Sequence, residues 1–174
     1  YYDYRHWDDG QRWEIIDGII FNMSPAPGTR HQVISMKLSQ QLFSYFAEKG
    51  CMVLAAPFDV RLPDHENEDD DDIRNVVQPD LSVICDKKKL DEKGCRGAPD
   101  VVVEILSPST AKQDLKYKLL LYQKHGVKEY WVVDATYKIL TQYRLGSDNQ
   151  YARGRIFGED EVFQLEPESR EEDA

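Results

Sequence analysis

The first hydrophobic segments of the chain lie on either side of a turn signal. Apolar residues dominate 13–16 and 19–21, and Asp17-Gly18 stands between them. This dipeptide suits the backbone of a two-residue turn between antiparallel strands. The pattern therefore predicts an N-terminal β-hairpin.

A helix is predicted next, because apolar residues recur at intervals of three to four positions. The stripe consists of Ile34, Leu38, Leu42 and Phe46, with Val33 and Phe43 beside it. We expect the helix to run from Thr29 to about Glu48 and to end at Gly50, with Thr29 and Gln32 as its capping box.

Several later segments have the composition of strands. The strands are expected over 52–62, 76–85, 100–106, 128–134, 139–145 and 151–157. Pro79 interrupts the second of them early. Residues 100–106 (DVVVEIL) are almost continuously β-branched and apolar, which is typical of a strand covered on both faces.

A second helix is expected between the two most apolar strands. It begins near Ser107, with Thr110 and Gln113 as a capping box, and runs to about Lys124 before Gly126. A strand–helix–strand unit within one sheet requires a right-handed parallel crossover. The order of elements predicts an α/β fold, a mixed β-sheet flanked by helices with an N-terminal hairpin.

Composition and charge suit one globular domain, with 174 residues, 41% hydrophobic and 31% charged. The net charge of -10 argues at first against a nucleic-acid partner, because phosphate contacts need Lys and Arg. However, residues 64–72 and 159–174 each contribute -7, so the remaining body carries +4. We expect a single domain over 1–158, with 64–72 as a mobile and dispensable acidic loop and 159–174 as an acidic tail.

Cysteines and hydropathy bear on the compartment. The cysteines, which are unevenly spaced and form no C-x-x-C, are Cys51, Cys85 and Cys95. Neither a disulfide framework nor a structural zinc site is expected from this set, and a reducing cytoplasm fits best. No apolar run approaches the ~20 residues of a membrane span, so no membrane association is expected.

Glu104 is the residue that most suggests chemistry. In DVVVEIL it shares a strand face with Val102 and Leu106. A carboxylate on a doubly covered strand is costly unless it is paired or binds a cation. Two interpretations stay open: Glu104 belongs to a functional site, or it pairs with a Lys or Arg of a helix.

Asp80 opens the strand that follows Pro79, and such a position is often only a turn or cap. If Asp80 and Glu104 lie on neighbouring strands and meet at one end of a sheet, they form what a hard divalent cation needs. Mg²⁺ prefers oxygen ligands, commonly one or two carboxylates with water.

Lys118 lies on the second expected helix, at the border of its buried face. One interpretation is an i,i+4 ion pair with Asp114, in the favourable order with the acid first. The other is an ammonium that leans toward the sheet and holds a phosphate or a water molecule.

The residues resemble the PD-(D/E)XK nuclease superfamily and, more closely, a large bacterial family described as restriction endonucleases of unknown function. The matching stretches are WEIIDG (13–18), MSPAPGTRH (23–31), VVQPDLSVICD (76–86), GAPDVVVEILSPST (97–110) and D-x-x-x-K with GVKEYWVVD (114–134). The resemblance covers about residues 12–145, and its long motif GAPDVVVEILSPST, with the downstream Asp and Lys, is more specific than the two letters PD.

The resemblance implies a role for each matching residue. Asp80 and Glu104 would be metal ligands, with the carbonyl of Ile105 as a third oxygen. The motif lysine falls at position 106, which is Leu106, so the arrangement is similar to variants in which a lysine of the next helix, here Lys118, takes its place. Glu14 matches an acid of an early element that binds a second metal or positions water, and the alternative is that it is only a surface acid of the hairpin.

The resulting hypothesis is a Mg²⁺- or Mn²⁺-dependent endonuclease that hydrolyses DNA, acting as a possible homodimer. The alternative is a non-catalytic module for nucleic acid or protein that keeps the nuclease fold, which Leu106 favours. A hydrolase of other phosphoesters is a third possibility, since no basic cluster marks a DNA groove. His31, in the first turn of its helix, is either a packed core-edge residue or a hydrogen-bonding partner of the site.

Overall fold

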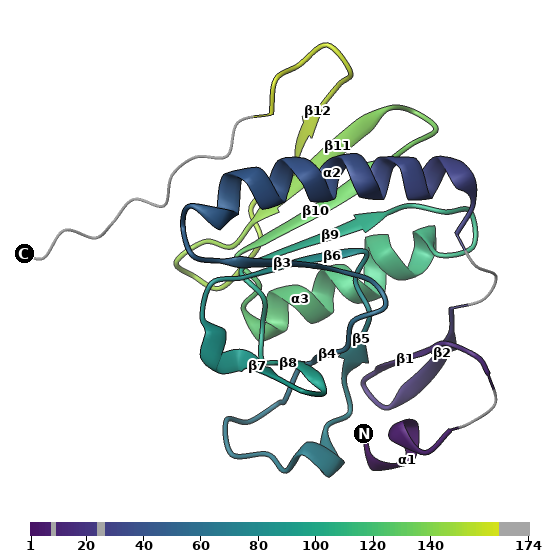
Figure 1. Ribbon diagram of the computed structural model, residues 1–174, viewed down its shortest axis with the longest axis vertical. Coiled ribbons are helices and arrows are strands. Elements are labelled where there is room, and N and C mark those ends of the chain that lie inside the picture. Colours follow the sequence, from purple (N-terminus) through teal and green to yellow (C-terminus); the bar gives the residue numbers. More distant parts are fainter. Residues whose placement is uncertain (8–9, 24–26, 164–174) are drawn as a thin grey trace, which may run out of the picture.

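The computed structural model describes residues 1–7, 10–23 and 27–163 (Figure 1). Within this part of the chain, the strands form two mixed sheets. The first has the order β2 (Ile19–Asn22), β1 (Trp13–Ile16), β5 (Val76–Val77), β4 (Val60–Arg61), β8 (Gly94–Arg96) and β7 (Leu90–Asp91). The second has the order β12 (Arg155–Phe157), β11 (Ile139–Arg144), β10 (Glu129–Asp134), β9 (Val101–Ile105), β6 (Leu81–Ile84) and β3 (Met52–Ala55).

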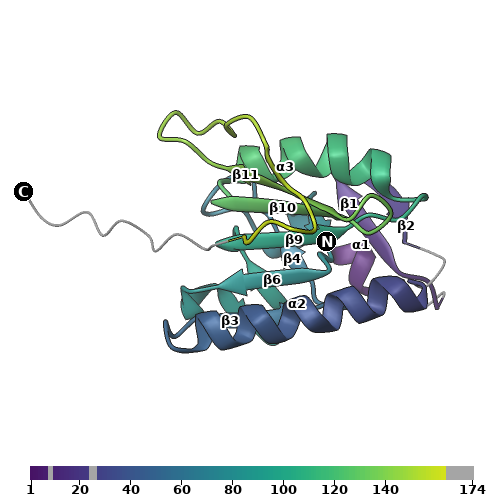
Figure 2. The ribbon, with the colours of Figure 1, turned by 90° about the horizontal axis from the view of Figure 1, so that it is seen from above.

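Helices cover both faces of the second sheet, as the sequence predicts. They are α2 (Thr29–Ala47) and α3 (Leu119–His125), the last continuing a π-helical turn, Gln113–Lys118. The short helix α1 (Tyr2–Arg5) lies away from this sheet, near the 3₁₀ turn at Asp70–Asp72, and another 3₁₀ turn lies at Lys87–Lys89. Figure 2 shows α2 on one face of the sheet and α3 on the other. The fold is therefore α/β, and β9 and β10 are parallel across the helical crossover, as expected.

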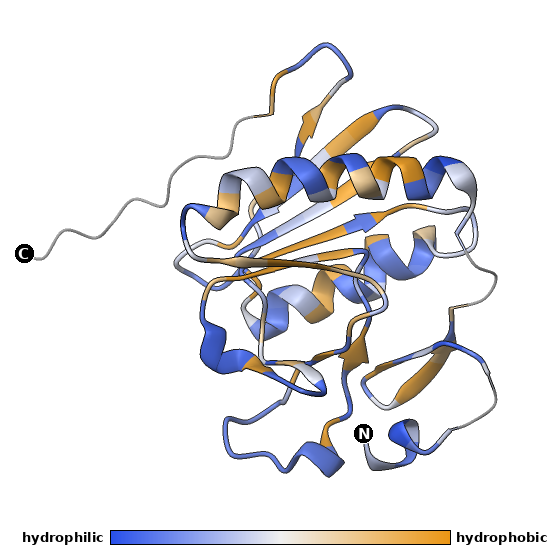
Figure 3. Cartoon of the chain, viewed as in Figure 1, coloured by the Kyte–Doolittle hydropathy of each residue, from blue (hydrophilic) through white to orange (hydrophobic). Residues whose placement is uncertain are grey.

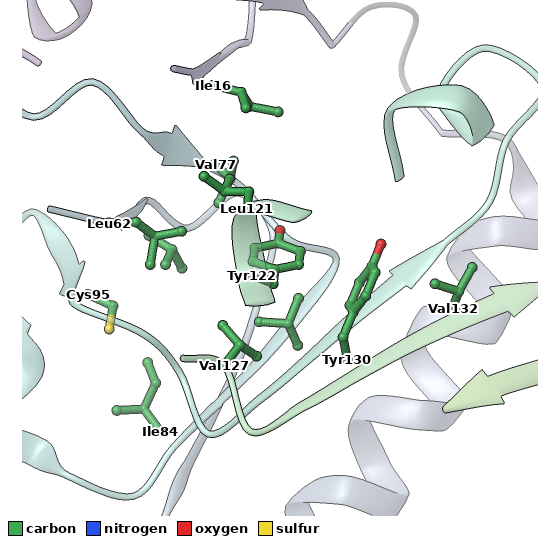
Figure 4. Close-up of a cluster of buried hydrophobic side chains, with 12 residues drawn as sticks. Ile16, Leu62, Val77, Ile84, Cys95, Leu121, Tyr122, Val127, Tyr130 and Val132 are labelled. Carbon is green, nitrogen blue, oxygen red and sulfur yellow. The ribbon is translucent and has the colours of Figure 1, made fainter. Parts of the chain in front are cut away.

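The alternation of side chains along β9 connects the two layers of core. Val101 and Val103 pack toward α2 with Leu42 and Phe46 of that helix. Val102 lies in the opposite cluster. That cluster includes Leu121, Tyr122 and Tyr130 (Figure 4). The strands of the second sheet carry long hydrophobic stretches between these two layers (Figure 3). Successive residues of a strand point to opposite faces, so Glu104 lies on the same face as Val102, toward α3.

The predicted N-terminal hairpin is confirmed. β1 and β2 are antiparallel with Ile16 opposite Ile19, and the turn residues Asp17 and Gly18 both have positive φ. Because the hairpin continues into the first sheet through β5, the fold has two sheets where the sequence suggested one.

Two of the predicted strands are each divided between the sheets. Residues 52–62 form β3 in the second sheet and β4 in the first, with Pro57 between them, and residues 76–85 form β5 and β6 on either side of Pro79. A proline has no N–H to donate to a ladder, so the chain changes sheets at these positions. The prediction of one continuous strand in each of these two segments was therefore wrong.

Both capping boxes expected at the helix starts were also wrong. Gly28 is the N-cap of α2 and Thr29 is its first residue, with no side-chain cap. In the second helix, Thr110 exchanges hydrogen bonds with Ser107, while the Gln113 side chain bonds elsewhere. The stop at Gly126 is confirmed, with φ 81° after His125.

The acidic segment 64–72, expected to be mobile and dispensable, forms ion pairs with bases outside it. Asp70 pairs with the buried Arg61, with Lys93 at 3.2 Å and with Arg96 at 3.1 Å. Asp64 pairs with Lys124 at 2.7 Å. Except for Arg61, these bases come from distant parts of the chain, so local composition did not reveal them. The tail expected at 159–174 lies outside the described residues from 164 onward.

The cysteines also depart from expectation, because Cys51 and Cys85 form a disulfide. Met52 pairs with Ile84 in the antiparallel β3–β6 register, so Cys51 and Cys85 form the next pair outward. The sequence spacing does not reveal this pairing. Cys95 is free and buried. The disulfide removes the support that the cysteine count gave to a reducing compartment. Among the described residues, no helix is long and apolar enough to cross a membrane.

Candidate active site

The site lies where β6 begins and β9 ends. Leu81 is opposite Val103 in the antiparallel register, so the next pair outward is Asp80 and Glu104. Asp80 Oδ2 accepts a hydrogen bond of 2.7 Å from the backbone N–H of Ile105. The two acids are thus brought to one end of the sheet although 24 positions separate them in the sequence.

Lys118 contacts Glu104 directly. Its Nζ lies 2.8 Å from Glu104 Oε1, and the hydroxyl of Tyr122 donates to the same oxygen at 2.9 Å. The Lys118 side chain is only 4% exposed. Residues 114, 118 and 122 are four positions apart, so one face of the helix carries Asp114, Lys118 and Tyr122 toward the end of β9.

Glu14 brings a third element to the cluster. Its Oε1 lies 2.8 Å from Lys118 Nζ and accepts 2.8 Å from the backbone N–H of Gln78, while its Oε2 accepts 2.8 Å from Gln113 Nε2. The i,i+4 pair of Lys118 with Asp114 also exists, at 3.6 Å. The glutamates are therefore the nearer partners of Lys118.

His31 lies in the first turn of α2 and faces the same sheet end. Its Nε2 is 3.1 Å from Asp80 Oδ2. The hydrogen bond to Asp80 raises the pKa of His31, against the opposing effect of burial. Its Nδ1 is buried without a hydrogen-bond partner among the described residues.

The electrostatics of the cluster reflect an excess of acids. Burial raises the pKa of Glu104 well above its ordinary value, and Lys118 offsets this only in part. Burial likewise raises the pKa of Asp114. Burial alone would lower the pKa of Lys118, but Glu104, Glu14 and Asp114 together hold it well above its ordinary value. Lys118 is therefore a permanent cation, whereas Glu104 and Asp114 hold protons more tightly than free carboxyls do.

The donor atoms at the sheet end are oxygens, the type that a hard divalent cation prefers. The hydrogen bonds described for Asp80 use Oδ2, and those for Glu104 use Oε1. In the described ranges, no group of three or more His, Cys, Asp or Glu side chains is arranged to hold a metal. A cation here would thus depend on two carboxylates, with the Ile105 carbonyl and water completing the set.

Sequence reasoning missed several members of the cluster. Asp114 entered it only as a partner of Lys118, Gln113 was assigned to a capping box, and Tyr122 and Gln78 were not singled out. The spacing D-x-x-x-K-x-x-x-Y was a usable signal, since it places three polar groups on one helix face. The contact of Gln113 with Glu14 spans 99 positions and had no local signal.

A groove of about 1230 Å³ lies elsewhere, between α2, β10, β11 and residues 157–163. Its lining is mostly apolar and includes Leu38, Trp131 and Phe163. None of Asp80, Glu104 and Lys118 lines it, so the groove is separate from the acidic cluster.

The chain is similar to several known proteins. A protein-family model, Uma2, described as "Putative restriction endonuclease", matches residues 1–171. An uncharacterized protein of Synechocystis sp. is 27% identical over 152 residues, which cover 86% of this chain and 75% of that protein. A crystal structure of a protein from Anabaena variabilis, described as a putative nuclease belonging to DUF820, has a TM-score of 0.69 at 21% identity. That match covers 89% of this chain and 81% of the other, and it supports the fold.

Proposed function

Since the chain belongs to the Uma2 family, described as "Putative restriction endonuclease", we propose that it is a divalent-metal-dependent endonuclease that hydrolyses DNA phosphodiester bonds. The observation that carries this proposal is the ratio of charges at the end of β6 and β9. Three carboxylates, those of Glu14, Glu104 and Asp114, lie within 3.6 Å of one ammonium, that of Lys118, and the carboxylate of Asp80 lies at the same sheet end. Such an excess of buried acid is stabilised by a further cation.

Mg²⁺ or Mn²⁺ is the proposed cofactor. Asp80, Glu104 and the carbonyl of Ile105 would hold it, because these oxygens lie at the same sheet end and suit a hard cation. When bound, the ion would polarise a phosphoryl oxygen and lower the pKa of a water molecule.

The residues around this position supply charge and order. Lys118 carries the ammonium that stabilises developing negative charge on a phosphoryl group. It takes the place of the motif lysine, since the position where that lysine would stand is Leu106 in this chain. Glu14 contacts Lys118 Nζ at 2.8 Å and is proposed to bind a second metal or to position water.

The proposed partner is DNA, with the mildly basic body of the chain facing the phosphates and a two-fold dimer for cleavage of a duplex. A cytoplasmic location belongs to the same proposal because the substrate lies there. The Cys51–Cys85 disulfide gives no support to a cytoplasmic location.

Plasmid cleavage tests the proposal. The wild type should cut DNA with Mg²⁺ or Mn²⁺ and not with a chelator. Glu104→Gln should abolish cleavage while keeping the fold, since it keeps the shape and removes the anion. Asp91→Asn, which alters an acid paired with Arg61 outside the site, is the matched control and should stay active.

A second candidate, a non-catalytic binding module, is favoured by one specific observation. Lys118 is only 4% exposed and is held by two glutamates, and the usual lysine position is Leu106. A wild type that binds DNA or RNA but cuts neither with Mg²⁺ nor with Mn²⁺ would support this module.

A further inference from the structure

We propose that Tyr122 and His31 are positioning residues that hold the two metal-binding carboxylates, each through one oxygen, so that the other oxygen is left for the ion. The inference rests on the proposed function. Neither residue would touch the ion or the substrate, since each acts through the carboxylate that it bonds.

Tyr122 holds Glu104 from the face of the sheet that α3 covers. The hydroxyl donates to Glu104 Oε1 at 2.9 Å, and Lys118 Nζ meets the same oxygen at 2.8 Å. The tyrosine is fully buried, and its ring packs edge-on against Tyr130 with centroids 4.9 Å apart (Figure 4). Packing therefore fixes the position of the hydroxyl, and the hydroxyl in turn restricts rotation of the carboxylate.

His31 and the backbone do the same for Asp80. His31 Nε2 lies 3.1 Å from Asp80 Oδ2, and the N–H of Ile105 donates to that oxygen at 2.7 Å. The histidine comes from α2, whereas the N–H comes from β9. Asp80 is thus held between a helix and a strand through one of its two oxygens.

The two arrangements share a pattern. Each carboxylate has two donors on one oxygen and no described donor on the other. Donors of this kind orient the ligands of metal sites, and removing one typically weakens metal affinity by roughly 10- to 100-fold. The remaining oxygens, Asp80 Oδ1 and Glu104 Oε2, are the ones assigned to the ion.

Mn²⁺ binding measured by electron paramagnetic resonance tests the Tyr122 arm without relying on cleavage. Tyr122→Phe removes only the hydroxyl and should weaken Mn²⁺ binding by roughly 10- to 100-fold. The matched control is Tyr151→Phe, whose hydroxyl bonds the Val127 carbonyl at 2.8 Å outside the site, and it should bind as the wild type does. Glu104→Gln supplies the background from the acidic segments.

The role of His31 is tested by one variant that should lose Mn²⁺ binding and another that should restore it. His31→Leu removes the donor to Asp80 and should weaken Mn²⁺ binding by a similar factor. His31→Gln places an amide N–H where Nε2 stands and should restore binding. Loss of packing alone would not be rescued in this way, so the pair separates positioning from a structural role.

The outcomes distinguish this inference from the proposed function. A wild type that binds no Mn²⁺ above the Glu104→Gln background would overturn both. A wild type that binds Mn²⁺, with folded Tyr122→Phe and His31→Leu variants that bind within twofold of it, would overturn the positioning role and leave the metal site standing. Thermal unfolding of each variant confirms that it is folded, and equal losses in Tyr122→Phe and Tyr151→Phe would also count against the inference.

Discussion

Two clusters of buried charge lie in this molecule, and they are built in opposite ways. In the first, Arg61 is the buried member, with Asp70 and Asp91 reaching toward solvent at 22% and 46% exposure of their side chains. In the second, Lys118 is buried together with its acids, since the side chains of Glu14 and Glu104 are 2% and 5% exposed. The acids of the first cluster are partly exposed to solvent, whereas those of the second are buried.

The pKa directions follow from this difference. Burial raises the pKa of Asp70, but Arg61, Lys93 and Arg96 outweigh it, so the pKa is lowered overall. For Glu104, burial raises the pKa and a single lysine fails to outweigh it. The Arg61 cluster therefore has enough cations for its acids and serves to attach the acidic segment. The Lys118 cluster has too few cations, which is expected of a site that takes one from solution.

Removing the cation from each cluster should produce the largest contrast. Lys118→Met leaves Glu14, Glu104 and Asp114 buried without a counter-charge and should cost roughly 3–5 kcal/mol of unfolding free energy. Arg61→Met should cost less, because Asp70 keeps Lys93 and Arg96 as partners. Urea denaturation at neutral pH measures both. A larger loss for Arg61→Met would contradict the comparison.

Adding a cation should separate the clusters next. At a Mn²⁺ concentration of 100 times its dissociation constant, binding to the folded state stabilises it by about 2.7 kcal/mol. The wild type and Asp91→Asn should both show the corresponding rise in melting temperature, while Glu104→Gln should lose it. An equal rise in all three would place the Mn²⁺ outside the Glu104 site.

Within the acidic segment, adjacent positions should differ. Asp70 bonds three bases, so Asp70→Asn should lose about 1.5–3 kcal/mol, the range for hydrogen bonds to charged groups. Asp71 pairs with Arg5 at 3.0 Å on the surface, and Asp71→Asn should change stability by about 1 kcal/mol or less. Denaturation curves of the two variants provide the check. Equal losses of stability in the two variants would favour the mobile loop that the composition of the segment suggests.

These contrasts also show how far the sequence was informative. The hairpin, the crossover from β9 to β10 and the stop at Gly126 follow from local signals, namely a turn dipeptide, continuous β-branched residues and a glycine with positive φ. The division of two expected strands between sheets did not follow, because it depends on which ladder each half joins after Pro57 and Pro79.

The same distinction applies to the charges. Glu104 stood out because an acid interrupted an apolar strand, and Lys118 because it followed at helical spacing. Arg61 gave no such signal, and its contacts with Asp70 and Asp91 come from the sheet register of β4 with β8 and from the segment that folds back over it. Composition counts charges, but only the fold decides which of them are paired. The disulfide was missed for the same reason, since it depends on the β3–β6 register.

The smallest expected effect is also the one that distinguishes the clusters by sign, as a function of pH. The pKa of Glu104 is raised in the folded state above its ordinary 4.5, so its contribution to stability is complete below pH 4.5 and is lost as the pH rises through the folded pKa. The pKa of Asp70 is lowered below 3.8, so its contribution is present above pH 3.8 and is lost as the pH falls through the folded pKa. Each tenfold change in proton affinity corresponds to about 1.4 kcal/mol. Urea denaturation across a pH series should therefore show Glu104→Gln reducing the loss of stability above pH 4.5, and Asp70→Asn reducing the loss below pH 3.8. If both variants flattened the same limb of the profile, the two clusters would not differ in the way that their burial requires.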